Sequence, residues 1–113
     1  MVVVILKDYT IQDAINIIYN CDYADIKESR HYLRRNSKRI NDLDLIQRTI
    51  LNKPLVGILK QDYNKFNVFY EHEYKPAYDL NIIILLTDNE ELELLTIMEN
   101  PRSRRERKAC IQK

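Results

Sequence analysis

Glycine is almost missing from this sequence, and proline is scarce. The 113 residues include one Gly and three Pro. A single glycine nearly excludes the glycine-rich loops that cradle nucleotide phosphates, because such loops need several residues without side chains. So few breakers of helices and strands also predict that regular secondary structure fills most of the chain.

Cysteine is scarce too, with only Cys21 and Cys110 in the chain. They lie far apart and lack the spacing of a metal site, so we expect two free thiols in a reducing cytoplasm. The sequence also lacks a Ser/His/Asp signature and the Cys/His spacing of zinc sites. We therefore expect neither a metal ion nor a cofactor.

Long hydrophobic runs are absent as well. The longest run, residues 80–86, is far shorter than the roughly 20 residues that a membrane-spanning helix needs. The apolar residues 1–6 lack a basic segment and a small-residue cleavage site, so they do not read as a signal peptide. We expect a cytoplasmic protein without a membrane partner.

Composition is that of an ordinary soluble protein, with 45% hydrophobic and 31% charged residues. The length predicts one domain over residues 1–113. Its C-terminal end, from about residue 102, is a basic tail.

The net charge of +1 conceals two basic segments, residues 27–39 and 102–108. Together they hold eleven of the 18 basic residues but two of the 17 acidic ones. Clustered positive charge is the electrostatic pattern of nucleic-acid binding, although a solvated tail has the same composition. The candidate RNA-binding residues are Arg30, Arg34, Lys38, Arg102, Arg104, Arg105 and Arg107.

Helical signals fill the first half of the chain. Thr10 precedes a helical apolar stripe and has Asp13 three residues on, which predicts a capped helix over residues 10–20. Further helices are expected over residues 29–39 and 41–52, the last ended by Pro54.

After Pro54 the hydrophobic period changes to two, which indicates strands. We expect four, joined by hairpins, over residues 55–60, 66–73, 79–87 and 91–98. The third has apolar residues at both parities, as in a central strand covered on both faces. Helices followed by hairpin-linked strands predict an α+β fold, with N-terminal helices packed on a four-stranded antiparallel sheet.

A pattern of short motifs resembles a known group of proteins. Its residues are His31, Arg35, Arg39 and Ile40, the strand residues 79–84 and 95–97, and the arginine-rich end, 102–107. In this order they resemble the small RelE/ParE-type toxin folds, and more closely an uncharacterised domain family with the same layout. The resemblance covers about residues 29–108.

The resemblance implies a RelE-like fold and a metal-independent endoribonuclease of a toxin–antitoxin-type system. Its partners would be RNA or the ribosome, and an acidic, antitoxin-like protein. RNA cleavage of this kind needs a base, a cation at the phosphate and an acid for the leaving oxygen. The candidate catalytic residues are His31, Arg35, Arg39, Tyr70, His72 and Lys75, with Tyr78 as an alternative hydroxyl donor.

A non-catalytic interpretation stays open beside the enzymatic one. Some relatives of the toxins bind a partner protein, so the chain could be a protein-interaction module of the same layout. His31 could then be a helix-surface residue, and His72 a cross-strand partner at a solvated edge. The tyrosines around the third strand could serve packing alone.

Overall fold

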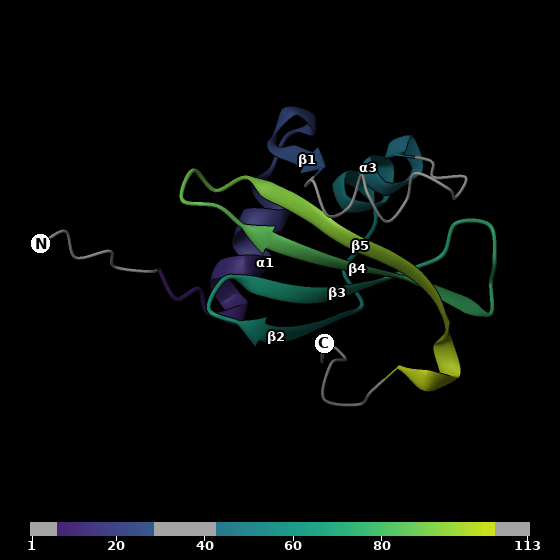
Figure 1. Ribbon diagram of the computed structural model, residues 1–113. Helices are drawn as coiled ribbons and strands as arrows, with labels where there is room; N and C mark the ends of the chain where they lie inside the picture. The colour runs from purple at the N-terminus through teal and green to yellow at the C-terminus, as the bar shows by residue number, and fades with distance from the viewer. Residues whose placement is uncertain (1–6, 29–42, 106–113) are drawn as a thin grey trace, which may run out of the picture.

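We obtained a computed structural model of the protein, which describes residues 7–28 and 43–105 (Figure 1). The elements are, in order, α1 (Ile11–Asn20), the 3-10 turn η1 (Tyr23–Asp25), β1 (Ile26–Glu28), α3 (Leu43–Asn52), β2 (Gly57–Asp62), β3 (Lys65–Glu71), β4 (Tyr78–Leu86), β5 (Leu92–Pro101) and the 3-10 turn η2 (Arg102–Arg104). The helix expected over residues 29–39 lies outside the described residues.

The strands form one five-stranded sheet in the order β1-β5-β4-β3-β2. Neighbours from β2 to β5 are antiparallel, whereas β1 runs parallel to β5. The expected four-stranded antiparallel sheet preceded by its helices is therefore wrong. The sheet is mixed, and β1 precedes α3 in the chain.

The missed strand, β1, is too short to reveal itself in the sequence. It has three residues, and alternation over so short a run cannot be recognised. What makes it a strand is the distant edge of β5, where Ile26 is the partner of Leu92 and is buried. An ion pair between Lys27 and Glu91 lies beside this pairing.

Helix α1 begins where local chemistry predicts. The Thr10 hydroxyl accepts from the Asp13 N–H at 3.0 Å, and the Asp13 carboxylate accepts from the Thr10 N–H at 2.9 Å. This capping box satisfies two N–H groups that would otherwise lack partners at the helix start. Ala14 and Ile18 are buried one turn apart, so the helix presents one apolar stripe to the sheet.

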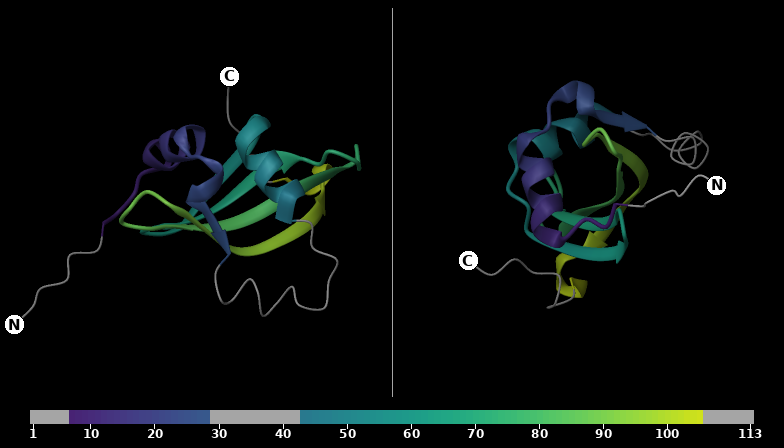
Figure 2. Two further views of the ribbon diagram at one scale, coloured as in Figure 1. Left: turned by 90° about the horizontal axis from the view of Figure 1, so that it is seen from above. Right: turned by 90° about the vertical axis from the view of Figure 1, so that its left-hand side faces the viewer.

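Both helices lie on the same face of the curved sheet, which Figure 2 shows from above and from one end. Ile46 and Ile50 of α3 join the α1 stripe in one core with the sheet. The sheet contributes Ile26, Ile58, Phe66, Val68, Tyr70, Leu80, Ile82, Ile84, Leu86, Leu92 and Leu94. Burying one such side chain is worth about 1.5–3 kcal/mol, so this layer carries most of the packing energy.

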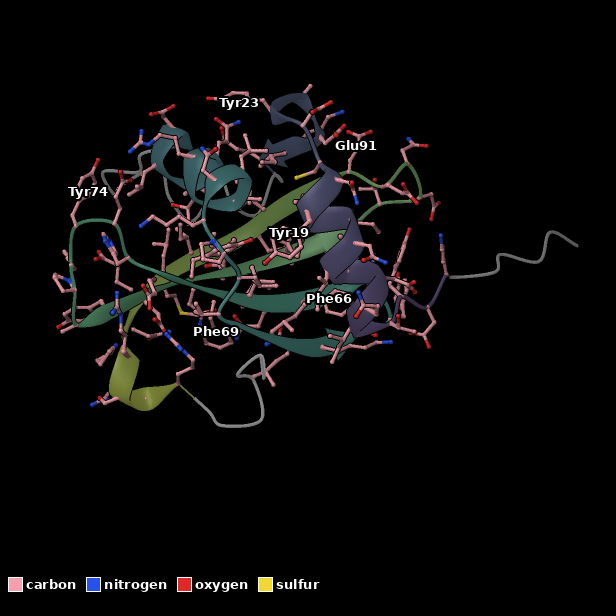
Figure 3. The ribbon with its side chains drawn as sticks, turned by 180° about the vertical axis from the view of Figure 1, so that it is seen from behind. Tyr19, Tyr23, Phe66, Phe69, Tyr74 and Glu91 are labelled. Carbon is pink, nitrogen blue, oxygen red and sulfur yellow. The ribbon has the colours of Figure 1, made fainter. Side chains whose placement is uncertain are left out.

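The opposite face of the sheet has a different character. Strand residues alternate between the two faces, so β3 directs Phe66 and Val68 to the core and Asn67 and Phe69 away from it. In Figure 3, Phe66 lies beneath α1 and Phe69 lies nearer to η2. We call this second side the open face, because α1 and α3 both lie on the other side of the sheet. Strand β4 is central, as expected, but the helices of the described residues, α1 and α3, cover only one of its faces.

In the part of the chain that the structure describes, no helix has the length and hydropathy needed to cross a membrane.

Candidate functional site

A pocket of about 200 Å³ lies on the open face, where the strands approach η2. We refer to it as the open-face pocket. Its lining residues are Leu59, Asn67, Phe69, Asp79, Asn81, Asn100, Pro101, Arg104 and Arg105. They come from four strands and the C-terminal end, so only the assembled sheet brings them together.

Strand register explains this convergence. Phe69 of β3 is the partner of Asn81 in β4, and Asp79 of β4 is the partner of Asn100 in β5. Because the side-chain period of a strand is two, Asn67 lies on the same face as Phe69. The pocket is thus a strip across neighbouring strands, polar along β4 and partly apolar along β3.

Two asparagines in this strip have unmet hydrogen-bonding capacity. The side-chain oxygens of Asn67 and Asn81 are buried, and neither has a hydrogen-bond partner among the described residues. Asn81 is only 3% exposed. A buried acceptor without a partner costs about 1–3 kcal/mol, and such atoms in folded proteins call for an explanation.

A charged pair closes one end of the pocket. Asp79 is 1% exposed, and the Arg105 guanidinium donates to both of its oxygens, at 2.6 and 2.5 Å. The Nε atom of Arg102 lies 3.7 Å from the same carboxylate. Such bidentate contacts are strong and geometrically specific, so they hold the segment after β5 against the sheet.

Arg104 supplies a cation at the same end. It is exposed and lines the pocket, and within residues 7–28 and 43–105 no carboxylate forms an ion pair with it. Arg104 and Arg105 together outweigh Asp79, which makes the lining net positive. A pocket with a net positive lining favours an anionic ligand.

The structure therefore brings part of the predicted RNA-binding set together. Arg104 and Arg105 line the pocket, and Arg102 adjoins it through Asp79. Seven other predicted residues lie outside the described part of the chain: His31, Arg35 and Arg39 of the catalytic set, and Arg30, Arg34, Lys38 and Arg107 of the RNA-binding set.

Tyr70, a predicted catalytic residue, lies on the other side of the sheet. Its side chain is fully buried in the core beneath the helices. Burial raises the pKa of its hydroxyl well above the ordinary value. The hydroxyl has no hydrogen-bond partner in the described ranges, and RNA on the surface cannot reach it.

His72 and Lys75 organise the turn between β3 and β4 rather than the pocket. The His72 Nδ1 atom accepts from the backbone N–H groups of Tyr74 and Lys75, at 3.0 and 3.2 Å. Its Nε2 atom lies 3.1 Å from a Glu99 carboxylate oxygen, which also pairs with the Lys75 ammonium at 2.7 Å. The Lys75 ammonium also lies over the ring of Tyr78, with its Nζ atom 5.9 Å from the ring centre. Both ring nitrogens of His72 are thus occupied.

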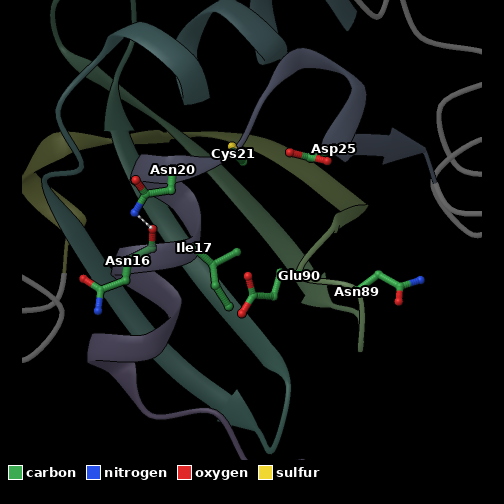
Figure 4. Close-up of a pocket in the computed structure, with 7 residues that line it drawn as sticks. All are labelled: Asn16, Ile17, Asn20, Cys21, Asp25, Asn89 and Glu90. Carbon is green, nitrogen blue, oxygen red and sulfur yellow. Dashed lines mark hydrogen bonds between the residues drawn. The ribbon is translucent and has the colours of Figure 1, made fainter.

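A second pocket, of about 360 Å³, lies between α1, η1 and the β4–β5 turn (Figure 4). Asp25 and Glu90 give its lining negative charge, and no cation of the described residues lines it. Burial raises the pKa of the nearby Cys21 thiol, which makes it a weak nucleophile. This lining repels a polyanion, so the open-face pocket is the better candidate.

Sequence reasoning missed the asparagines and Phe69. A signal was present, because Asn81 interrupts the apolar run of residues 80–86, and a polar residue inside a buried strand is unusual. The described residues contain no group of three or more His, Cys, Asp or Glu that could hold a metal ion.

Comparison with known proteins gives a family. No curated protein and no solved structure matches the chain, and no finding connects it to the RelE/ParE toxins. The sequence profile of the MJ0788 family matches residues 12–84. This match runs from α1 into β4 and covers more than half of the sequence, and the chain therefore belongs to the MJ0788 family.

Proposed function

We propose that this protein binds RNA on the open face of its sheet. The observation that carries the proposal is the open-face pocket itself, where Arg104 adjoins buried amides with unmet hydrogen-bonding capacity. Arginine contacts to phosphate supply affinity, and polar groups within reach of a base supply discrimination. The basic residues of segment 30–39 stay predicted RNA contacts from the sequence alone.

Binding rather than cleavage is what the described residues favour. An endoribonuclease needs an accessible base or acid, whereas Tyr70 is buried and both nitrogens of His72 are engaged. A catalytic contribution from His31, Arg35 or Arg39 stays a prediction. The likeness to toxin–antitoxin ribonucleases also stays a prediction, because it rests on sequence motifs.

The proposal predicts binding of RNA that weakens steeply with salt. We expect the full chain to bind a labelled single-stranded RNA of mixed sequence, as measured by fluorescence anisotropy at several salt concentrations. Arg104→Ala should reduce the slope of log affinity against log salt by about 0.7, because one phosphate contact is lost. Truncation after Pro101 is a poorer test, because it also removes Arg105 from the buried Asp79.

Arg48→Ala provides the matched control. It removes the same charge from α3, on the helical side, where Arg48 pairs with Asp44 and Glu73. Its slope should equal that of the unaltered chain. Absence of binding at low salt would remove RNA from consideration and leave an acidic protein as the better partner of the positive pocket. Cleavage that His31→Ala abolishes would instead establish the enzyme.

A further inference from the structure

We infer that the open-face pocket receives a nucleobase with an exocyclic amino group, and so prefers adenine or cytosine to uracil. The inference rests on the proposed RNA binding and deepens it. It starts from two pocket atoms that have no hydrogen-bond partner within residues 7–28 and 43–105, the side-chain oxygens of Asn67 and Asn81.

The two asparagines are neighbours across the β3–β4 ladder and line the same pocket. Asn81 is the partner of Phe69, and Asn67 precedes Phe69 by two residues, so the asparagines are diagonal on one face. The backbones of diagonal residues lie about 7–8 Å apart, which is within reach of their side chains, so one small group can lie between the two amides. An amino group carries two N–H bonds, and it can donate one to each oxygen.

Uracil fits the same place poorly. Its edge offers one N–H donor between two carbonyl oxygens, and those carbonyls would face the amide oxygens as like dipoles. A site built to hydrogen-bond one partner discriminates against an analogue that leaves its polar groups unpaired. Adenine and cytosine both offer the amino group, and asparagine is a common partner of adenine.

The rest of the lining suits a nucleotide in this orientation. The pocket volume of about 200 Å³ is several times the roughly 30 Å³ share of one water molecule. Phe69, Leu59 and Pro101 provide the apolar surface on which a base ring packs. Arg104 lies in the exposed part of the lining, where the phosphate of an inserted nucleotide would emerge.

Base preference is measured with three homopolymers of equal length: oligoadenylate, oligocytidylate and oligouridylate, each titrated into the full chain by anisotropy. We expect the first two to bind at least five-fold more tightly than the third, because one good base contact is worth about 5- to 150-fold. Asn81→Ala should bring the three affinities together. Arg104→Ala should weaken all three and leave their ratio unchanged, because a phosphate contact carries no base preference.

The outcomes distinguish failure of the base preference from failure of RNA binding itself. Equal affinity for the three RNAs would overturn the inference, since the asparagines would then hold only water, and would leave RNA binding intact. Tighter binding of oligouridylate would overturn it as well, because reversed amides present N–H donors to the carbonyls of uracil. Failure of all three to bind would remove both. Thermal unfolding of Asn81→Ala near that of the unaltered chain excludes a folding defect as the cause of a lost preference.

Discussion

At the scale of single residues, Glu90 is notable for its backbone. Its φ of 60° makes it the one non-glycine residue with positive φ in the described ranges. The positive φ belongs to a tight turn closed by two backbone hydrogen bonds. The Glu90 N–H donates to the Thr87 carbonyl, and the Thr87 N–H donates to the Glu91 carbonyl, both at 3.0 Å. A left-handed conformation costs a residue with a side chain roughly 1–2 kcal/mol.

Glycine at this position should therefore stabilise the protein. We expect Glu90→Gly to raise the free energy of unfolding by about 1 kcal/mol, since the strain is relieved at some cost in unfolded-state entropy. Thermal unfolding would register a rise of several degrees. Asp88→Gly in the same turn is the control: Asp88 lacks positive φ, so there only the entropic cost remains and the midpoint should fall.

Tyr70 shows that the type of a residue does not by itself determine its role. From the sequence, Tyr70 is either a hydroxyl donor in RNA cleavage or a packing residue of the sheet. Its position on β3 directs the ring into the core, where burial raises its pKa and isolates the hydroxyl. Asn67, three residues earlier on the same strand, faces the pocket instead. The parity of a residue on its strand decides between core and site.

At the scale of elements, α1 depends on its capping box. The pKa of Asp13 is lowered from its ordinary value of 3.8, first through the hydrogen bond from the Thr10 backbone and then through that from the Thr10 hydroxyl. A carboxyl group whose folded pKa is depressed stabilises the fold above its unfolded pKa. That contribution is lost as the pH falls through the folded value.

The cap gives a prediction at this scale. Thr10→Ala should cost about 1 kcal/mol of stability at neutral pH, measured by urea denaturation. Asp13→Asn should flatten the dependence of the unfolding midpoint on pH below about 4, where the carboxylate otherwise takes up a proton. An acid dependence unchanged in Asp13→Asn would show that other carboxylates dominate. Gln12→Ala, on the exposed side of the same helix, controls for helix propensity.

At the scale of the whole molecule, one ion pair joins the C-terminal end to the sheet. Arg105 follows β5 in the chain, and its guanidinium binds Asp79 in the neighbouring strand β4. Asp79 is almost fully buried, and a buried carboxylate needs such a paired cation to offset its lost solvation. The contact also shapes one end of the open-face pocket.

Removing this partner should be costly. We expect Arg105→Ala to lower the free energy of unfolding by roughly 3 kcal/mol, because an uncompensated charge is left inside the protein. The residual contact with Arg102, at 3.7 Å, should keep the loss at the lower end of the usual range. Chemical denaturation measures it. The double variant Asp79→Asn/Arg105→Ala should lose less than Arg105→Ala alone; a larger loss would contradict the electrostatic explanation.

Local chemistry was sufficient for several features. Thr10 and Asp13 define the start of α1 within four residues, and the alternating residues of β3 and the apolar run of β4 indicate their strands. The basic segment around Arg104 is visible in the charge pattern alone. Such features depend on neighbours along the chain, and the sequence displays those directly.

Tertiary structure decided the rest, because it depends on distant partners. Ile26 is in a strand only because β5 offers it an edge, and Asp79 is tolerated as a buried carboxylate because Arg105 reaches it. Asn67 and Asn81 become one site through the register of β3 on β4. A shift of that register by one residue would turn either asparagine to the other face of the sheet. The sequence by itself determined which elements form, and the pairing of the strands determined which residues meet.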